Sequence, residues 1–257
     1  MEEKIKAFER LLNIMDELRE KCPWDKKQTI ESLRHLTIEE TYELSDAILK
    51  GNNEELKKEL GDILLHIVFY ARIASETNQF NIADVMNALC DKLIFRHPHI
   101  YGDVKVNNEE DVKQNWEQLK QIEKGGNTSV LSGVPNSMPA LLKAYRIQEK
   151  ARAVGFDWEH PEQVFEKVKE EINELNEEVA KENNLSKIED EFGDVLFALI
   201  NYGRFIKVNP EDALERTNKK FIKRFNYMEQ KIKAQGKQLA DCTLDEMDVF
   251  WNEAKKL

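Results

Sequence analysis

The sequence predicts an all-α protein made of two tandem, repeated helical-bundle domains, and three observations support this prediction. Only 10 Gly and 6 Pro occur in 257 residues, so the residues that interrupt helices are few. Charged residues make up 34% of the chain, and runs rich in Val, Thr and Tyr, which favour strands, are scarce. The third observation is an internal repeat, because one series of acidic, basic and aromatic residues occurs in each half of the chain.

Five landmarks follow the same order in both halves, and chance does not explain so many ordered matches. The N-terminal copy contains Asp25, Glu39-Glu40-x-x-Glu43, Glu59-x-x-Asp62, Lys92 with Arg96, and Trp116-x-x-x-Lys120. The C-terminal copy contains Asp157, Glu170-Glu171-x-x-Glu174, Glu191-x-x-Asp194, Lys220 with Arg224, and Trp251-x-x-x-Lys255. We refer to the two copies as the N-terminal and the C-terminal repeat.

Two long helices are expected within the N-terminal repeat. In residues 27–49 the apolar side chains of Ile30, Leu33 and Leu44 recur at helical spacing. Residues 54–76 begin with charged side chains and then become almost wholly apolar, which is typical of the central helix of a bundle. Because the landmarks recur, the C-terminal repeat is expected to contain the same pair of helices.

A loop-rich segment separates the repeats, since Gly, Ser, Asn and Pro cluster in the sequence GGNTSVLSGVPNSMP. We therefore predict an N-terminal domain over residues 1–125, a linker over 126–138 and a C-terminal domain over 139–257. The C-terminal domain is expected to open with a helix that starts at Pro139 and ends before Gly155, because glycine favours a helix C-terminus.

Carboxylates are expected to gather between the two helices of each pair. In the C-terminal repeat, Glu170, Glu171 and Glu174 project from one side of a helix, because residues three and four apart share a face. Glu191 and Asp194 share a face of the next helix, at the border of an apolar run. If the helices pack side by side, these carboxylates repel one another unless a cation lies between them.

A bound hard cation removes this conflict, and carboxylate oxygens without Cys or His suit Mg²⁺, with Mn²⁺ as a substitute. A second candidate site in the N-terminal repeat consists of Glu39, Glu40, Glu43, Glu59 and Asp62. Glutamate-rich helices are often only solvated faces, but duplication of the paired pattern favours a metal site. A di-iron site is disfavoured, because these helices contain no Glu-x-x-His motif.

Phosphate is the ligand that best suits a carboxylate-held Mg²⁺ in an acidic protein. Cationic side chains are then expected close to the phosphate oxygens. The candidates in the C-terminal repeat are Lys167, Lys187, Lys220 and Arg224, for each of which surface ion pairing is the simpler role. Trp251 is a candidate for stacking on a base, although tryptophan more often closes a core.

Composition and missing motifs disfavour other functions. A net charge of −11 argues against nucleic-acid binding, which requires a basic surface. The chain contains neither a G-x-x-x-x-G-K-[ST] nor a G-x-G-x-x-G phosphate-binding loop. Its three cysteines are scattered, and its apolar runs are far shorter than the ~20 residues of a membrane span. We therefore expect a soluble, cytoplasmic protein that binds neither membranes nor nucleic acids.

The pattern E-E-x-x-E followed by E-x-x-D resembles that of the all-α nucleoside triphosphate pyrophosphohydrolase superfamily. The tandem arrangement, with CPWD (22–25), FRHPHIYGD (95–103), SGVPNSMPALLKAYRIQEKARAVGFDW (132–158) and EFGDVLF (191–197), resembles the two-domain MazG family over essentially the whole chain. This resemblance implies the all-α NTP pyrophosphatase fold and a homodimer. It also implies hydrolysis of nucleoside triphosphates (NTPs and dNTPs) between the α- and β-phosphates, which yields the monophosphate and pyrophosphate.

The resemblance also assigns roles to residues of the C-terminal repeat. It implies that Mg²⁺ is held by Glu171, Glu174, Glu191 and Asp194. It implies nucleotide contacts from Lys167, Lys187, Lys220, Arg224, Trp251 and Lys255. The expected reaction is in-line attack of a water activated by bound Mg²⁺, with Glu170 or Glu171 orienting or deprotonating that water.

The two repeats are not equal in their basic residues. Leu36 and Glu55 stand where the C-terminal repeat has Lys167 and Lys187. The N-terminal repeat keeps Lys92, Arg96, Trp116 and Lys120. We therefore predict that the main catalytic site lies in residues 139–257 and that the N-terminal repeat is a weaker site or a dimerisation or regulatory module. Two alternatives remain open: a base- or deoxy-selective dNTP pyrophosphatase that removes unwanted nucleotides, and a non-catalytic helical scaffold.

Overall fold

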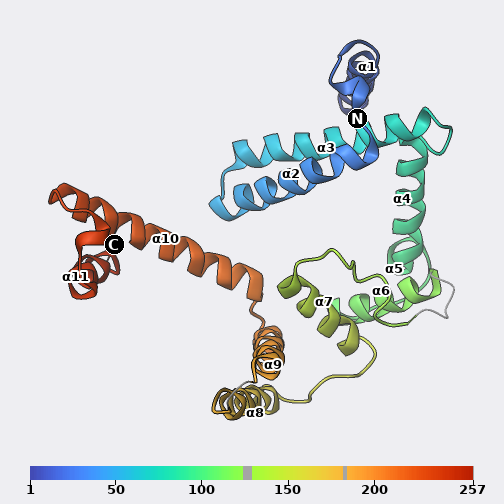
Figure 1. Cartoon of the computed structure of the whole chain (residues 1–257). Helices are drawn as coiled ribbons and strands as arrows, with labels where there is room; N and C mark the ends of the chain where they lie inside the picture. The colour runs from blue at the N-terminus through green and yellow to red at the C-terminus, as the bar shows by residue number, and fades with distance from the viewer. Residues whose placement is uncertain (124–128, 182–183, 257) are drawn as a thin grey trace. The chain divides into compact units, whose positions relative to one another are not determined.

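The computed structural model describes residues 1–123, 129–181 and 184–256, and within these ranges it contains helices, turns and irregular segments but no strand (Figure 1). The predicted all-α fold class is confirmed. The chain divides into two compact units, Met1–Leu119 (unit 1) and Lys120–Leu257 (unit 2). The domain limits 1–125 and 139–257 stay a prediction, and part of the predicted linker lies outside the described residues.

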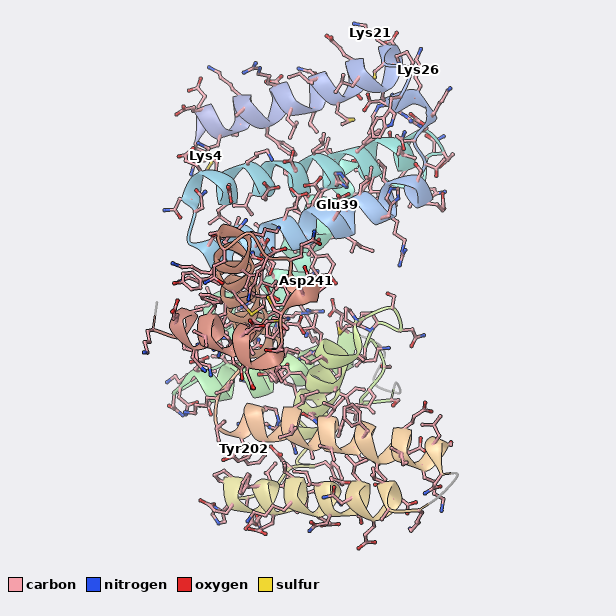
Figure 2. The ribbon with its side chains drawn as sticks, turned by 60° about the vertical axis from the view of Figure 1, so that its left-hand side comes forward. Lys4, Lys21, Lys26, Glu39, Tyr202 and Asp241 are labelled. Carbon is pink, nitrogen blue, oxygen red and sulfur yellow. The ribbon has the colours of Figure 1, made fainter. Side chains whose placement is uncertain are left out.

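Unit 1 contains the helices of the N-terminal repeat. They are α1 (Glu2–Lys21), the 3₁₀-helix η1 (Asp25–Lys27), α2 (Ile30–Lys50), α3 (Asn53–Ser75), α4 (Ile82–Arg96), the short α5 (Pro98–Tyr101) and α6 (Glu109–Glu123), within which the division between the units falls. The long pair α2 and α3 forms a hairpin (Figure 2). Gly51 ends α2 in the left-handed conformation (φ 65°), and the Asn52 side chain accepts hydrogen bonds from the first turn of α3.

Unit 2 repeats this hairpin. Its helices are α7 (Ala140–Arg152), α8 (Pro161–Val179), α9 (Leu185–Phe205), α10 (Pro210–Ala234), the 3₁₀-helix η2 (Leu239–Asp241) and α11 (Leu244–Ala254). Helices α8 and α9 lie side by side, and the ring centroids of Phe165 and Tyr202 are 5.1 Å apart between them (Figure 2). Helix α7 packs on α9, and α11 folds back on α10. As expected, α7 stops shortly before Gly155, whose φ of 85° is easily adopted only by glycine.

The core of unit 1 forms where α1, α2 and α3 meet. Met15, Leu33, Val68 and Phe69 are almost fully buried and contact one another. Burial of such side chains contributes about 1.5–3 kcal/mol each, which holds the hairpin against α1. No described helix is long and apolar enough to cross a membrane.

Candidate active site

The α8–α9 hairpin brings together three glutamates, Glu171, Glu174 and Glu191, which we call the C-terminal triad. Glu171 and Glu174 lie one turn apart on α8, and Glu191 faces them from α9. One carboxylate oxygen from each residue lies within 4.8 Å of the other two. Glu171 is buried, Glu191 is half-buried and Glu174 is exposed. Two helices thus bring together three carboxylates, one buried, one half-buried and one exposed.

Lys167 lies beside this triad, one turn before Glu171 on α8. Its ammonium is 2.7 Å from Glu170 Oε1 and 2.8 Å from Glu171 Oε1. The hydrogen bond with Glu170, followed by the one with Glu171, holds the pKa of Lys167 well above its ordinary value. Lys167 therefore stays positively charged at the edge of the triad, where it can bind an anion.

The three carboxylates repel one another. The pKa of Glu174 is raised, first by desolvation and then by the negative charge of Glu171. A divalent cation offsets both causes, and the donor set contains oxygen only, which fits a hard metal ion such as Mg²⁺ or Mn²⁺. The residues present therefore fit the metal that the sequence predicts.

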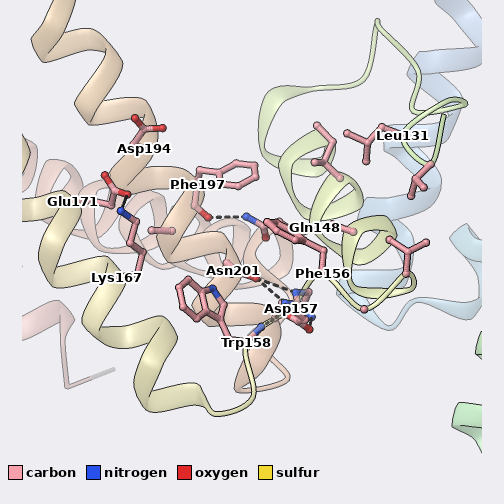
Figure 3. Close-up of a pocket in the computed structure, with 17 residues that line it drawn as sticks. Leu131, Gln148, Phe156, Asp157, Trp158, Lys167, Glu171, Asp194, Phe197 and Asn201 are labelled. Carbon is pink, nitrogen blue, oxygen red and sulfur yellow. Dashed lines mark hydrogen bonds and ion pairs between the residues drawn. The ribbon is translucent and has the colours of Figure 1, made fainter.

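A cavity of about 630 Å³ opens next to the triad and is lined mainly by apolar side chains (Figure 3). Lys167, Glu171 and Asp194 lie at its charged edge, while Phe156, Trp158 and Phe197 contribute aromatic rings. This volume falls in the range of small-molecule sites, which combine an apolar lining with a few polar groups. The cavity can therefore enclose an aromatic group while the charged edge holds phosphates.

The polar groups of the cavity are held in fixed positions. Gln148 is buried, and its Nε2 donates a hydrogen bond of 2.8 Å to the carbonyl oxygen of Phe197 (Figure 3). Its Oε1 is buried and has no partner among the described residues, so it is an acceptor available to a ligand. Asn201 Oδ1 accepts hydrogen bonds from Arg204, whose guanidinium also pairs with Asp157. A buried acceptor without a partner costs free energy, so a ligand donor at Gln148 stabilises the site.

The α2–α3 hairpin holds an equivalent N-terminal triad, formed by Glu40, Glu43 and Glu59, whose ligand atoms also lie within 4.8 Å of one another. Glu59 is only 5% exposed. Its Oε1 is 3.3 Å from the ammonium of Lys58, while its Oε2 is buried and has no hydrogen-bond partner among the described residues. The pKa of Glu40 is raised by desolvation and by the charges of neighbouring carboxylates, the largest of which is that of Asp62.

Four predicted acidic residues lie outside the two triads. Asp194 lines the cavity next to Glu171 but does not belong to the group that meets within 4.8 Å. Asp62 likewise lies near its triad without joining it. Glu170 is exposed and pairs with Lys167, and Glu39 is exposed on α2. The triads therefore contain three of the five acids predicted for each repeat, and the ligand roles of the others stay predictions.

The remaining predicted nucleotide contacts lie on other parts of unit 2. Lys187 is exposed in the first turn of α9. Lys220, Arg224, Trp251 and Lys255 are on α10 and α11, and none of them lines the cavity. Trp251 packs against Phe221 with ring centroids 5.0 Å apart, as expected for a tryptophan that closes a core. In unit 1, Lys92 and Arg96 are on α4, and the Arg96 guanidinium lies over the ring of Trp116.

Sequence reasoning missed the cavity residues Gln148, Asn201, Phe197 and Trp158. Asn201 and Phe197 lie on α9 beyond Asp194, where the sequence shows only an apolar run. Gln148 lies in a helix that contains many charged residues, so the sequence does not predict that it is buried. Its burial follows from the packing of α7 on α9. Two signals were available, because Trp158 directly follows the landmark Asp157 and both Trp158 and Gln148 lie in the motif of residues 132–158.

Comparisons with known proteins identify the family to which the chain is similar. The MazG nucleotide pyrophosphohydrolase domain matches the chain twice, at residues 28–101 and 159–228. The chain is 47% identical to a nucleoside triphosphate pyrophosphohydrolase/pyrophosphatase MazG of Thermotoga maritima, over 96% of this chain and 95% of that protein. It is 40% identical to a nucleoside triphosphate pyrophosphohydrolase of Escherichia coli, over 97% of both chains.

Two further similarities cover less of the related protein or of this one. The uncharacterized protein YabN of Bacillus subtilis is 46% identical over 97% of this chain and 52% of its own length. A crystal structure of a mazG-related protein from Thermotoga maritima covers 44% of this chain and 98% of its own, with 27% identity and a TM-score of 0.40.

Proposed function

We propose that this chain, which belongs to the MazG nucleotide pyrophosphohydrolase family, hydrolyses a broad range of NTPs and dNTPs at the α–β phosphate bond. The products are then a nucleoside monophosphate and pyrophosphate. One observation carries the proposal: the C-terminal triad and Lys167 border a largely apolar cavity of about 630 Å³. A charged edge next to an apolar cavity matches a molecule with a polyphosphate at one end and a base at the other.

Members of this family are expected to use a divalent metal, and we propose Mg²⁺ as the ion. Glu171, Glu174 and Glu191 would hold it, with Asp194 as a further ligand. When bound, Mg²⁺ neutralises phosphate charge and lowers the pKa of a coordinated water.

The side chains of unit 2 supply the remaining functions. Lys167 is held positive by its carboxylate neighbours and stabilises the negative charge that develops on the pyrophosphate leaving group. Glu170, which is exposed and hydrogen bonds to Lys167, or Glu171 orients the attacking water and accepts its proton. The base enters the cavity, where Trp158 and Phe197 provide aromatic surface and Gln148 Oε1 accepts a hydrogen bond from a base N–H.

We further propose a homodimer, in which a second copy completes the phosphate site. Lys220, Arg224, Trp251 and Lys255 do not line the cavity of their own chain. Phe192 and Leu196 on α9, and Phe221 and Ile222 on α10, are each at least 47% exposed. Large apolar surface of this kind is typical of a protein–protein interface. The second copy could therefore bring the basic residues of α10 to the triad.

The proposal assigns the main hydrolytic site to the C-terminal repeat. The N-terminal repeat lacks a counterpart of Lys167, because Leu36 takes that position. A base- or deoxy-selective enzyme is the second candidate function, because the fixed, unpaired Gln148 Oε1 favours bases that present a donor to it.

Incubation of the pure protein with Mg²⁺ and each of the eight ordinary NTPs and dNTPs tests the proposal. Monophosphate and pyrophosphate are the expected products with most of these substrates. Diphosphate and inorganic phosphate would show that a different bond is cleaved. Turnover of one nucleotide alone would favour the selective enzyme, and no turnover with Mg²⁺ or Mn²⁺ would favour a non-catalytic scaffold.

A further inference from the structure

Residues 153–158, which follow α7 and which we call the 153–158 segment, form one wall of the cavity in unit 2. Five consecutive residues of this segment line the cavity, namely Val154, Gly155, Phe156, Asp157 and Trp158. The segment contains turns and bends but no helix. An irregular wall of this kind has no helical hydrogen-bond ladder of its own, so its shape depends on contacts with the neighbouring helices.

The first of these contacts is with the end of α7. Phe156 N donates a hydrogen bond of 3.1 Å to the carbonyl oxygen of Ala151, and Gly155 N donates one of 2.9 Å to that of Arg152. This pair of bonds, with Gly155 in the left-handed region, is the Schellman arrangement that ends many helices. It fixes the chain as far as Phe156 and leaves the next two residues to be held by other groups.

The second contact is an ion pair between Asp157 of the segment and Arg204 of α9. Arg204 donates from Nη1 to Asp157 Oδ2 at 2.9 Å and from Nη2 to Oδ1 at 2.5 Å, while its Nε and Nη2 also donate to Asn201 (Figure 3). The two side chains are only 7% and 18% exposed, so water screens this pair less than a surface pair. Arg152 lies 3.7 Å from the same carboxylate but is 59% exposed and adds little.

The ion pair also reaches Trp158. The backbone N of Trp158 donates a hydrogen bond of 3.0 Å to Asp157 Oδ1, the oxygen that also accepts from Arg204 Nη2. A carboxylate held at both oxygens by a guanidinium cannot turn freely, so the backbone of Trp158 is held with it. Trp158 is 45% exposed, and core packing therefore fixes its ring only in part.

The corresponding groups of unit 1 differ together. Counting from the aligned landmarks, Arg72 takes the position of Arg204, and Lys26 takes that of Trp158. Arg72 pairs with acids of α1 and of the C-terminal end of α3. The repeat that has no aromatic ring at this position thus directs its arginine elsewhere, which links the ion pair of unit 2 to the tryptophan beside it.

We propose that Asp157 and Arg204 are positioning residues for the base, because together they hold Trp158 as the surface on which the base stacks. Neither side chain touches the phosphates, and their effect on the reaction passes through the tryptophan ring. The inference rests on the proposed function, in which the base enters this cavity. It predicts that the ion pair governs the affinity for the nucleotide and leaves the chemical step at the triad unchanged.

A double-mutant cycle on the full chain tests whether Asp157 acts through Trp158. Asp157→Asn and Trp158→Ala should each raise KM for Mg²⁺-ATP about tenfold and leave kcat within about twofold, because stacking on the base is lost. In the Trp158→Ala background, Asp157→Asn should change KM by less than about twofold, since the ring that it positions is absent. Glu159→Gln, an exposed carboxylate just beyond the segment, is the control and should leave KM within about twofold in both backgrounds.

Arg204→Lys approaches the same ion pair from α9 and replaces Asp157→Asn in the cycle if that variant does not fold. Lysine keeps the positive charge but cannot form the two parallel hydrogen bonds, so KM should rise by about threefold, and this rise should also disappear in the Trp158→Ala background. Circular dichroism shows which variants are folded.

Two results would overturn the proposal. One is an unchanged KM in folded Asp157→Asn or Arg204→Lys, and the other is the same rise in KM with and without Trp158, which would mean that the ion pair only stabilises the fold. Failure of the proposed function would instead appear as absent NTP turnover by the unmodified protein.

Discussion

The two triads contain the same three glutamates on equivalent helices, yet their surroundings differ. In unit 2 the triad has Lys167 on one side and a cavity of about 630 Å³ on the other. In unit 1 the equivalent positions hold Leu36 and the buried core residue Phe69. The same kind of hairpin therefore carries an acidic triad in both units, whereas the residues beside the triad differ. The acidic cluster persists in unit 1, while the position that borders the cavity in unit 2 is taken over by core packing.

The arginine networks differ in the same way. In unit 2, Arg204 pairs with Asp157 at 2.5 Å and borders the cavity. The equivalent Arg72 of unit 1 pairs instead with Asp16 at 2.5 Å and with Glu76 at 3.2 Å. In unit 2 the arginine and its partner Asp157 both line the cavity, whereas in unit 1 the equivalent arginine pairs with acids of α1 and of the C-terminal end of α3.

Loss of one triad glutamate should give the largest difference between the repeats. Glu174→Gln removes a carboxylate that we propose as a metal ligand, which should cost several kcal/mol of transition-state stabilisation, or about 10³–10⁴-fold in kcat/KM. The matched Glu43→Gln should leave NTP hydrolysis nearly unchanged, because the N-terminal repeat has Leu36 in place of Lys167 and the core residue Phe69 in place of Asn201. Steady-state kinetics of both variants with Mg²⁺-ATP measure this. Greater loss in Glu43→Gln than in Glu174→Gln would reverse the assignment of the catalytic repeat.

Truncating the side chain at the aligned positions of Phe69 and Asn201 should lower the free energy of unfolding by different amounts. Phe69→Ala removes a side chain that is 2% exposed and should lower the free energy of unfolding by about 3–5 kcal/mol. Asn201→Ala, at the equivalent position beside the cavity, should lower it by less, about 1–2 kcal/mol, because only the hydrogen bonds from Arg204 are lost. Urea unfolding followed by circular dichroism measures both values. Equal losses would mean that the two positions are equally packed and would remove the basis for the contrast.

The helices and the acidic pattern could be predicted from sequence because both depend on local spacing. Glu40 and Glu43, like Glu171 and Glu174, share a helix face by their separation alone, and the structure brings each pair together with a glutamate from the next helix. The same acidic spacing occurs twice in the chain, which supports the prediction of a paired cluster in each repeat.

The cavity could not be predicted, because it depends on tertiary packing. In unit 2, α7 packs on α9 and its Gln148 hydrogen bonds to Phe197 beside the cavity. In unit 1, Met15 of α1 packs against Phe69 of α3 in the core. The sequence shows that Asn201 and Phe69 differ at one aligned position. Only the packing shows that Asn201 borders a cavity in unit 2 and that Phe69 lies in the core of unit 1. Lys220 and Arg224 illustrate a further limit, since a motif match does not reveal whether one chain or two supply a site.

A larger side chain at the cavity of unit 2 should hinder entry of the base. Asn201→Phe introduces the residue found at the equivalent position of the N-terminal repeat. We expect KM for ATP to rise roughly 10–100-fold with a smaller change in kcat, because the phosphates still reach the triad while the base is excluded. Asn201→Ala is the control that keeps the space open and should leave KM within about threefold. An unchanged KM in Asn201→Phe would show that the base does not enter this cavity.

The smallest expected effect concerns the ion pair between Arg19 and Glu76 in unit 1. Arg19 Nε donates to Glu76 Oε1 at 2.8 Å, and this hydrogen bond lowers the pKa of Glu76 below its ordinary value of 4.5. The pair therefore stabilises the folded state fully above that ordinary value, and the stabilisation is lost as the pH falls through the lowered pKa. Because Glu76 is 35% exposed, Glu76→Gln should lower the free energy of unfolding at pH 7 by only about 0.2–1 kcal/mol. Urea titrations of both proteins should show this difference shrink below pH 4.5, and a difference that grows with acidity would assign the opposite sign to the pair.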